Sequence, residues 1–384
     1  MKRIIILTLI SWSSNIYSQP CAGQTIFLTE PFQCNLNPWV LVFEDNFDGN
    51  SLDLTKWEYG PKRIRICNNE QQYYTSGNNI EVSNGSLKLI AKEEVLFAKV
   101  YHWKPENEHL YCNGNFRGIN ARWFNYTSAN IQSIKKFPHG RFEAKIKIPK
   151  GRGFWPAFWT YAGNPVYNEI DILEFWGIPP TQSTRHRMNI HYDYGDGRKD
   201  CATNYNGTDF SQDFHIFGLI WDENKIEWFV DGVIKRTDTR LYSTIGQPVT
   251  VCPIPHGFYV MNKIYTMDPM RIILNLAIRG DEEDDGPDSS TPFPSQMEVE
   301  WVRYYQRHSC QDISIIDATQ YPLDNTVFNV IVGDNINIHC NYIIQSGQQL
   351  DIIAKSSITL GPGFIAESGS TFSARMEPTV CGSN

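Results

Sequence analysis

Short runs in which apolar and polar residues alternate recur along most of the chain, from residue 39 to about residue 307. The runs 141–146 and 225–230 are examples, and they are rich in β-branched and aromatic residues. This alternation is typical of antiparallel strands with one solvated face. Asn84-Gly85 and Asp231-Gly232 separate such runs and are dipeptides favoured in tight hairpins. No convincing long amphipathic helix pattern appears, so we predict an all-β chain folded as a β-sandwich.

The pattern changes after residue 307. The segment 308–384 contains no Trp and repeats a short apolar run followed by a turn with Gly, at 330–334, 343–347 and 364–369. The intervals are uneven, which weakens the evidence for a true repeat. We predict a small β-rich accessory module of solenoid-like character at 308–384, with a linker and disordered tail as the alternative.

The first residues predict export. Lys2 and Arg3 precede an apolar stretch at 4–10, and Ser18 is a small residue suited to cleavage. We therefore expect a signal peptide at 1–18, an N-terminal extension at 19–38, and a secreted protein; a buried N-terminal strand is the alternative. No segment approaches the ~20 apolar residues of a spanning helix, so we expect no membrane insertion.

Composition narrows the function further. The net charge of −8 provides no basic field for a nucleic-acid partner. Aromatic residues make up 13% of the chain, which suits carbohydrate-binding surfaces as well as β-rich cores. The nine cysteines permit disulfides after export, although their pairing does not follow from the sequence. An odd number leaves at least one thiol without a partner in the same chain, and none has the spacing of a zinc site.

Three carboxylates stand within six residues of an apolar, β-prone run. In a regular strand Glu169 and Asp171 share one face, whereas Glu174 falls on the other. A β-bulge at 172–173 would return Glu174 to the acidic face. Adjacent carboxylates repel each other, and a glycosidase uses that repulsion to keep one group protonated while another is ionised. From the spacing alone, a solvated edge strand with chance acidic residues is the alternative.

Tryptophans flank this acidic cluster. Trp155 and Trp159 alternate within 153–159 and therefore share one face of a strand, while Trp176 follows Glu174 closely. Most aromatic stripes of this kind belong to a core. Beside carboxylates in an exported protein, however, a Trp ring is a good stacking platform for a sugar, so all three are candidate substrate-binding residues.

The segment Glu169-Ile-Asp171-Ile-Leu-Glu174 resembles the signature of glycoside hydrolase family 16, in the longer form typical of its laminarinase-, agarase- and carrageenase-like members. Further segments are similar to family landmarks in the family's order: 43–49, 68–75, 128–133, 140–149, 153–159, 226–232, 273–278 and 300–306. The resemblance covers roughly residues 39–307. It implies a β-jelly-roll sandwich whose concave sheet carries an open substrate cleft.

The resemblance also implies roles for individual residues. Glu169 would attack the anomeric carbon, Glu174 would protonate the leaving oxygen and then activate water, and Asp171 would hydrogen-bond the nucleophile. Trp155 would stack on a sugar near the cleavage point. Asn69 and Glu70 match a cleft segment of the family that contacts sugar hydroxyls, and His191 matches a His beside the acid/base. Trp159 stays open between the cleft and the core.

A structural calcium ion is a further implication of the resemblance, since many members bind one on the convex side. Glu300, together with carbonyl groups near Gly85, matches the position of that site. The family residue there is commonly Asp, and Glu300 departs from it. No cofactor is expected to be required for the reaction.

The sequence as a whole predicts a secreted, retaining endo-glycosidase that acts as a monomer on a polysaccharide. β-1,3-Glucan is the first expected substrate, with mixed-linkage glucan and agar- or porphyran-type galactans as alternatives. A non-catalytic glucan-binding protein and a transglycosylase also stay open. The presence of both Glu169 and Glu174 favours an enzyme over the former, and products longer than the substrate would identify the latter.

Overall fold

The computed structural model describes part of the chain in detail. The described residues are 25–28, 31, 34, 36–60, 70–99, 111–112, 115–116, 121–163, 168–192, 199–249, 252, 254–261, 268–280, 286–316 and 318–377. The predicted signal peptide and the candidate Asn69 lie outside them. None of the helices in the described part is long and apolar enough to cross a membrane.

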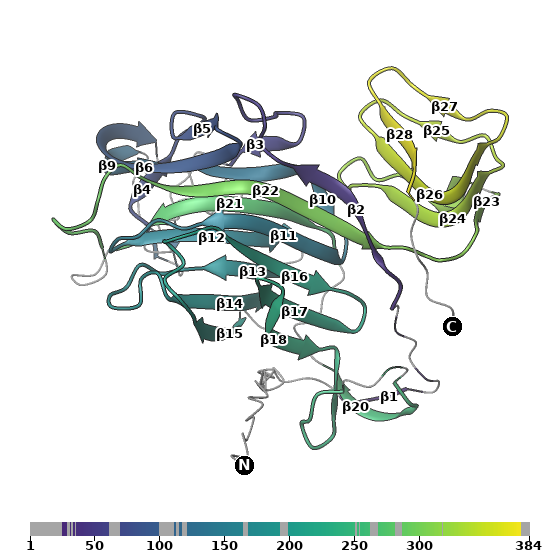
Figure 1. Ribbon diagram of the computed structural model, residues 1–384, viewed down its shortest axis with the longest axis horizontal. Coiled ribbons are helices and arrows are strands. Elements are labelled where there is room, and N and C mark those ends of the chain that lie inside the picture. The colour runs from purple at the N-terminus through teal and green to yellow at the C-terminus, as the bar shows by residue number, and fades with distance from the viewer. Residues whose placement is uncertain are drawn as a thin grey trace, which may run out of the picture.

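Two large sheets face each other (Figure 1), and their described strands pair antiparallel except for one parallel pair at the edge of the second sheet. The sheet that carries the acidic cluster, here called the cleft sheet, has the strand order β15 (Lys199–Asn206), β14 (Arg185–Tyr192), β13 (Asn168–Glu174), β12 (Phe154–Tyr161), β21 (Met270–Ile278), β10 (Asn130–Phe137) and β3 (Trp57–Tyr59). Neighbouring strands of this sheet are antiparallel throughout the described residues.

The second sheet, here called the outer sheet, covers one face of the cleft sheet. Its order is β18 (Val233–Thr239), β17 (Lys225–Val230), β16 (His215–Trp221), β11 (Gly140–Lys147), β22 (Ser295–Arg307), β6 (Ser86–Lys99), β9 (Ala121–Ser128) and β4 (Gln72–Tyr74). β2 (Trp39–Asp45) also pairs with β22, and β5 (Ile80–Ser83) pairs with β6. The predicted all-β sandwich is confirmed.

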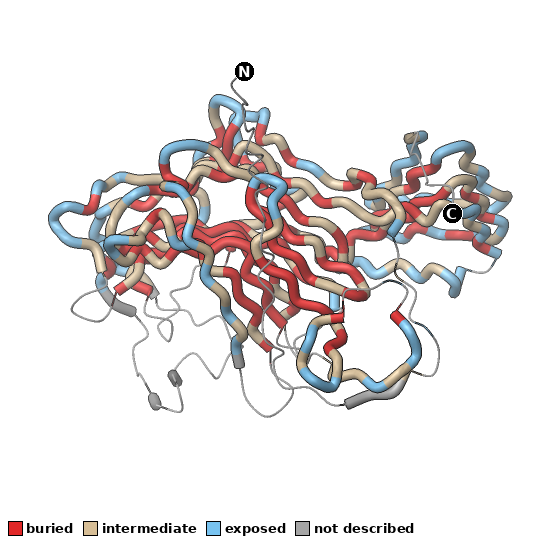
Figure 2. Tube along the Cα trace, turned by 60° about the horizontal axis from the view of Figure 1, so that its bottom comes forward, coloured by how far each residue is buried: buried red, intermediate tan, exposed pale blue. Residues whose placement is uncertain are grey.

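The core lies between the two sheets. Phe142 and Leu219 of the outer sheet and Phe158 and Leu274 of the cleft sheet are fully buried in one continuous apolar cluster. Figure 2 shows the buried stretches concentrated in the central strands, with exposed residues mainly in the connections. Because apolar side chains alternate along these strands, each sheet buries one face and leaves the other for solvent or substrate.

Smaller elements attach to the sandwich. β1 (Thr25–Leu28), β20 (Gly257–Met261) and β19 (Leu241–Ser243) form a separate sheet, and β7 (Tyr111–Cys112) pairs with β8 (Asn115–Phe116). A disulfide between Cys34 and Cys252 ties the N-terminal extension to the main body. Cys201 and Cys310 each take part in a disulfide as well. Within the described residues Cys340 is a free cysteine, as the odd count of cysteines predicted for at least one thiol.

The segment after β22 forms a stack of parallel strands, here called the C-terminal unit. Its strands are β23 (Ile313–Ile315), β24 (Val330–Ile338), β25 (Ile343–Ile344), β26 (Gln349–Leu360), β27 (Ile365–Ala366) and β28 (Thr371–Met376), with a short 3-10 helix η2 (Ala318–Gln320). Val330, Asp351 and Ser373 are in register in neighbouring strands, so successive coils are 21 and 22 residues long. This arrangement is solenoid-like, although the sequence repeat looked irregular.

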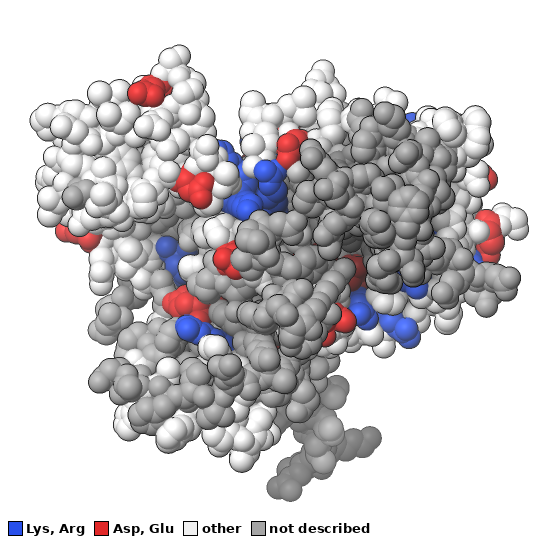
Figure 3. All heavy atoms as spheres, turned by 180° about the vertical axis from the view of Figure 1, so that it is seen from behind, with Lys and Arg blue, Asp and Glu red and all other residues white. Residues whose placement is uncertain are grey.

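The C-terminal unit packs against the sandwich. The Phe328 ring lies 5.9 Å from that of Phe43 and 5.3 Å from that of Phe137, measured between centroids. Val332 and Ile353 join the same apolar cluster as the sandwich core. Seen from behind (Figure 3), a group of basic side chains lies beside this unit. The unit is therefore docked by apolar contact and is more than a tethered tail.

We expect Phe328→Ala to destabilise the whole chain by about 3 kcal/mol, because it removes a buried ring from a core shared by both parts. Chemical denaturation measures this loss. Ile316→Ala is the control, since Ile316 is 68% exposed and its truncation costs little. Equal effects of the two substitutions would mean that the two parts fold independently of this contact.

Candidate active site

A β-bulge in β13 changes the face of the sheet to which its acidic residues point. Against β12, Asp171 pairs with Trp159 and Leu173 pairs with Phe158, so that Ile172 is an extra residue without a partner of its own. The ladder to β14 shifts by one residue over the same stretch. The bulge predicted at 172–173 is thus confirmed.

The bulge brings the three carboxylates to one face. Glu169, Asp171 and Glu174 pair with alternate residues of β12, in the order Tyr161, Trp159 and Ala157. Alternate residues of β12 point to the same face of the sheet, and the residues paired with them point to that face as well. The three carboxylates therefore lie on one face. All three carboxylates are buried, and together they line a cavity of about 30 Å³.

The bulge is held from the core side by two side chains. The Trp228 indole Nε1, which comes from the outer sheet, donates to the Asp171 carbonyl at 2.9 Å. The His186 ring Nε2 lies 2.8 Å from the Ile172 carbonyl. Burial lowers the pKa of His186 to about 4, so the ring is neutral near pH 7 and donates through Nε2. These contacts satisfy carbonyl groups at the point where the ladder is irregular.

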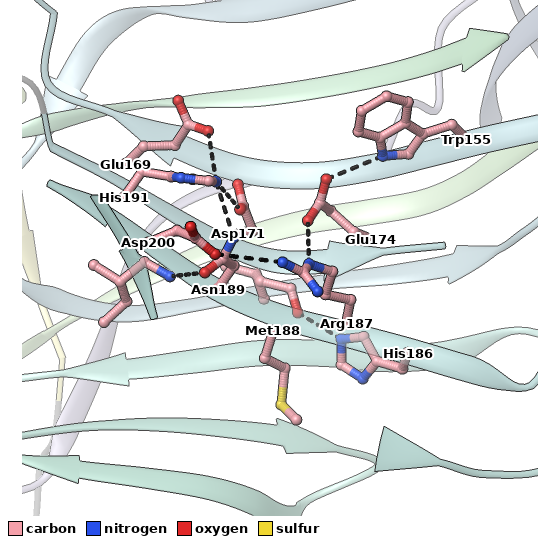
Figure 4. A network of polar contacts seen from close by, with 12 residues as sticks. Trp155, Glu169, Asp171, Glu174, His186, Arg187, Met188, Asn189, His191 and Asp200 are labelled. Carbon is pink, nitrogen blue, oxygen red and sulfur yellow. Dashed lines mark hydrogen bonds and ion pairs between the residues drawn. The ribbon is translucent and has the colours of Figure 1, made fainter. Parts of the chain in front are cut away.

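Glu174 is buried and lies between Trp155 and Arg187 (Figure 4). Burial, with the negative charge of Asp171 as a smaller cause, raises its pKa to about 8. Trp155 Nε1 donates to its Oε1 at 3.0 Å, and Arg187 Nε lies 3.9 Å from its Oε2. Glu174 therefore retains a proton at neutral pH, which is the state required of a general acid.

Glu169 and Asp171 share a histidine. The Nε2 atom of His191 lies 3.6 Å from Glu169 Oε1 and 3.3 Å from Asp171 Oδ2, and the amide of Asn189 lies 2.9 Å from the same nitrogen. Glu169, Asp171 and His191 each offer one atom that could coordinate a metal ion, and these three atoms lie within 4.8 Å of one another. The sequence predicted His191 beside the acid/base Glu174; its Nε2 atom lies instead beside Glu169 and Asp171, and its role at the site stays a prediction.

Other predicted sugar-binding residues meet at the same cavity. Trp155, Trp159 and Glu70 line it. Trp159 is buried, and its Nε1 donates to Asn275 Oδ1 at 2.7 Å, so the indole forms part of the wall of the cavity. Glu70 accepts hydrogen bonds from Gln72 Nε2 and the Tyr74 hydroxyl at 2.7 and 3.2 Å.

Several lining residues were missed by the sequence reasoning. They are Tyr74, Asn130, Asn275, Ala157 and Ala277. All five lie inside segments that the sequence analysis identified as similar to family landmarks, although no role was predicted for them. The strand pairing of β12 with β21, which brings Asn275 opposite Ala157, assembles this part of the cavity.

Trp176 has a different environment from the other two tryptophans. It lines a neighbouring pocket, and the guanidinium groups of Arg187 and Arg279 lie over its ring, 4.4 and 4.7 Å from the centroid. The ring is thus engaged by two arginines and is not a bare platform for sugar. As a substrate-binding residue Trp176 stays a prediction.

The proposed calcium ligands lie on the outer sheet. Glu300 Oε2 is 2.5 Å from Lys145 Nζ, and Gly85 occupies the hairpin turn between β5 and β6 with a φ of 68°. Calcium needs about six to eight oxygen ligands, and an ammonium group this close to the carboxylate opposes a second cation. The residues described around Glu300 do not fit a calcium ion, and no role is derived from one.

A family model described as glycosyl hydrolases family 16 matches residues 68–303. The chain belongs to this family. The resemblance stated from the sequence is thereby confirmed, together with the assignment as a glycoside hydrolase. The match covers every residue of the acidic cluster and the strands on either side of it.

Individual relatives agree with this assignment. The chain is 30% identical over 289 residues to a glucan endo-1,3-beta-glucosidase of Cryptopygus antarcticus, covering 69% of this chain and 91% of that protein. It is 27% identical to glucan endo-1,3-beta-glucosidase A1 of Niallia circulans, covering 72% of this chain but 39% of that protein. The catalytic domain of an endo-1,3-beta-glucanase (laminarinase) from Thermotoga petrophila RKU-1 superimposes with a TM-score of 0.52 at 27% identity, over 71% of this chain and 99% of that domain.

The raised pKa of Glu174 predicts a pH-dependent stability. Below pH 4.5, its ordinary pKa, the carboxyl is protonated in both the folded and the unfolded chain. Between pH 4.5 and about 8 the unfolded chain releases the proton while the folded chain retains it, so the folded state loses stability as the pH rises. Glu174→Gln removes this loss. We expect the Tm of the variant minus that of the wild type to grow across this window and level off above it.

Thermal melts from pH 4 to 9 measure this difference. Glu367→Gln, at an exposed position of the C-terminal unit, is the control and should give a difference that stays flat with pH. A flat difference for Glu174→Gln would mean that Glu174 is already ionised in the folded enzyme at neutral pH.

Proposed function

We propose that this chain is a secreted, retaining endo-glycosidase that hydrolyses a β-linked polysaccharide, with β-1,3-glucan as its first substrate. The observation that carries the proposal is the bulged strand β13, which presents Glu169, Asp171 and Glu174 on one face of a cavity. The choice of β-1,3-glucan is supported by relatives named as glucan endo-1,3-beta-glucosidases. Agar- and porphyran-type galactans and mixed-linkage glucan stay as alternatives.

The reaction proceeds in two steps. Glu169 attacks the anomeric carbon as the glycosidic C–O bond breaks, and Glu174 gives its proton to the leaving oxygen. The glycosyl-enzyme ester is then hydrolysed by water, which passes a proton to Glu174 and releases Glu169 as a carboxylate. Two displacements at one carbon retain the β-configuration. The pKa of about 8 supports Glu174 as the acid, because the group is protonated when the first step begins.

Neighbouring residues prepare the two glutamates for these steps. Burial, assisted by the negative charge of Asp171, raises the pKa of Glu174 and keeps its proton in place, while Trp155 Nε1 orients the Glu174 carboxyl through its hydrogen bond. The Nε2 atom of His191 lies within 4 Å of both Glu169 and Asp171 and holds a polar group against the two carboxylates. Asp171 thus acts on the charge state of its neighbours without forming a bond to the sugar.

Secretion and domain roles belong to the same proposal. Residues 1–18 act as the signal peptide, 39–307 as the catalytic domain and 308–384 as the accessory module. The disulfide Cys34–Cys252 supports export, because such bonds persist in oxidising compartments. All described residues that line the cavity lie between residues 70 and 277, which supports a cleft built entirely by the catalytic domain.

We expect Glu169→Gln and Glu174→Gln each to lower kcat by roughly 10²–10⁴-fold or more with the fold preserved, since each removes a group that makes or breaks a bond. Asp171→Asn should cost less. Reducing-end release from laminarin, with circular dichroism on each variant, measures this. Glu227→Gln is the matched control, since Glu227 is a buried glutamate of the outer sheet. Near-wild-type turnover by either cluster variant would refute the assignment.

The stereochemistry of the product tests the mechanism independently. In a retaining enzyme the two carboxyl groups lie about 5–5.5 Å apart and the nucleophile attacks directly, whereas an inverting enzyme needs about 6.5–9.5 Å to admit water. We therefore expect the β-anomer first. Proton NMR of the anomeric signals in the opening minutes, before mutarotation, records the order. Initial release of the α-anomer would exclude Glu169 as a nucleophile.

A further inference from the structure

A second pocket lies next to the catalytic cavity, beyond Glu174 along β13. Its volume is about 80 Å³, several times the roughly 10–15 Å³ that one water molecule needs. It is lined by Trp176, Ile178, Thr181, Arg185, Arg187 and Asn204, and is here called the arginine pocket. Of these residues, Trp176 and Arg187 also contact the surroundings of Glu174, so the pocket adjoins the site of cleavage.

The register of β14 explains why the pocket opens on the same face as the cleft. Arg185, Arg187, Asn189 and His191 are alternate residues of this strand, and His191 reaches the catalytic carboxylates. The intervening residues of β14 are buried on the core side. Asn204 pairs with Arg187 across to β15 and therefore shares its face. A sugar chain bound over Glu174 would meet these side chains next.

Positive charge is the distinguishing property of this pocket. Arg187 lies over the Trp176 ring, as does Arg279 from β21's C-terminal end. Arg185 is exposed, and its guanidinium forms no ion pair with any described residue. The nearest acidic groups leave this charge largely uncompensated: Asp200 lies 3.5 Å from Arg187 but is more than half exposed, and Glu174 keeps its proton at neutral pH.

Arg187 also has unused hydrogen-bonding capacity. Its Nε atom is buried, and among the described residues it has no hydrogen-bond acceptor. The carboxylate of Glu174 lies 3.9 Å away, beyond hydrogen-bond distance. A buried donor without an acceptor costs free energy that a bound ligand can recover. A guanidinium presents donors in a fixed fork that matches the oxygens of a carboxylate or a sulfate.

We propose that the arginine pocket binds an anionic substituent, a sulfate ester or a carboxylate, on the sugar unit beside Glu174. This inference rests on the proposed function, because it assumes that a polysaccharide occupies the cleft. Neutral chains are cleaved without this contact. Chains that carry the anionic group are bound more tightly, since Arg185 and Arg187 pair with it in a partly desolvated site.

Binding to an inactive enzyme tests the proposal separately from catalysis. The probes are neutral, sulfated and carboxylated oligosaccharides of one β-linked glucan, and a neutral and sulfated pair of one β-linked galactan. Calorimetry on the Glu169→Gln protein should give a Kd for a charged probe that is lower by on the order of tenfold than for its neutral counterpart, a difference equivalent to one charge-assisted hydrogen bond. The preference should shrink at 0.5 M NaCl, because salt screens the ion pair.

Arg185→Gln in the same background should reduce the preference to less than about twofold, since half of the guanidinium pair is gone. Arg185 contacts no catalytic carboxylate, so this variant leaves Glu174 undisturbed. Lys88→Gln is the matched control: it removes the same charge from the outer sheet, where Lys88 pairs with Glu81, and should keep the full preference.

The possible results separate this inference from the proposed function. Equal binding of charged and neutral probes, or a preference that Arg185→Gln leaves intact, would overturn the arginine pocket while wild-type hydrolysis of any probe still supported the glycosidase. A preference for the carboxylated or for the sulfated probe alone supports the pocket and identifies its anion. Binding preference without hydrolysis of any probe by the wild type would support the pocket and refute the proposed function.

Discussion

Two glutamates five residues apart cannot share a face of a regular strand, because side chains alternate with a period of two. The extra residue Ile172 changes this parity for Glu174 relative to Glu169, and the acidic cluster depends on it. The irregular backbone is stabilised from outside the strand, by Trp228 of the outer sheet and by His186 of β14. The packing of the two sheets thus determines the geometry of the cluster, and a change deep in the core would alter chemistry in the cleft.

The neighbours of each carboxylate then distinguish groups that look equivalent in the sequence. Glu174 is desolvated and lies next to the charge of Asp171. Burial first, and then this charge, raise the pKa of Glu174 to about 8. Glu169 and Asp171 instead have His191 within 4 Å. On β14, Arg187 and Arg185 lie beyond Glu174, so the side chains that face the cleft change from acidic to basic within a few residues. A substrate with one charged substituent would be oriented by this change.

Most of the fold and the centre of the site could be predicted from local sequence. Alternation marked the strands, and the acidic segment indicated both the bulge and the family. The surroundings of Trp176 could not be predicted in this way, because the arginines over its ring come from β14 and from the end of β21. Glu300 was expected as a metal ligand, and Lys145 from the neighbouring strand pairs with it. In both cases the deciding partner comes from another strand.

The sequence by itself determined which segments are strands, which strand carries the carboxylates and where that strand must bulge, because periodicity and side-chain chemistry are local properties. Only the tertiary structure decided which strands lie beside β13, and therefore that Asn275 closes the cavity, that Arg185 and Arg187 form a pocket next to it, and that Phe328 joins the C-terminal unit to the sandwich core. Strand order and packing depend on contacts between residues many positions apart, and the burial that raises the pKa of Glu174 exists only once those contacts have excluded water.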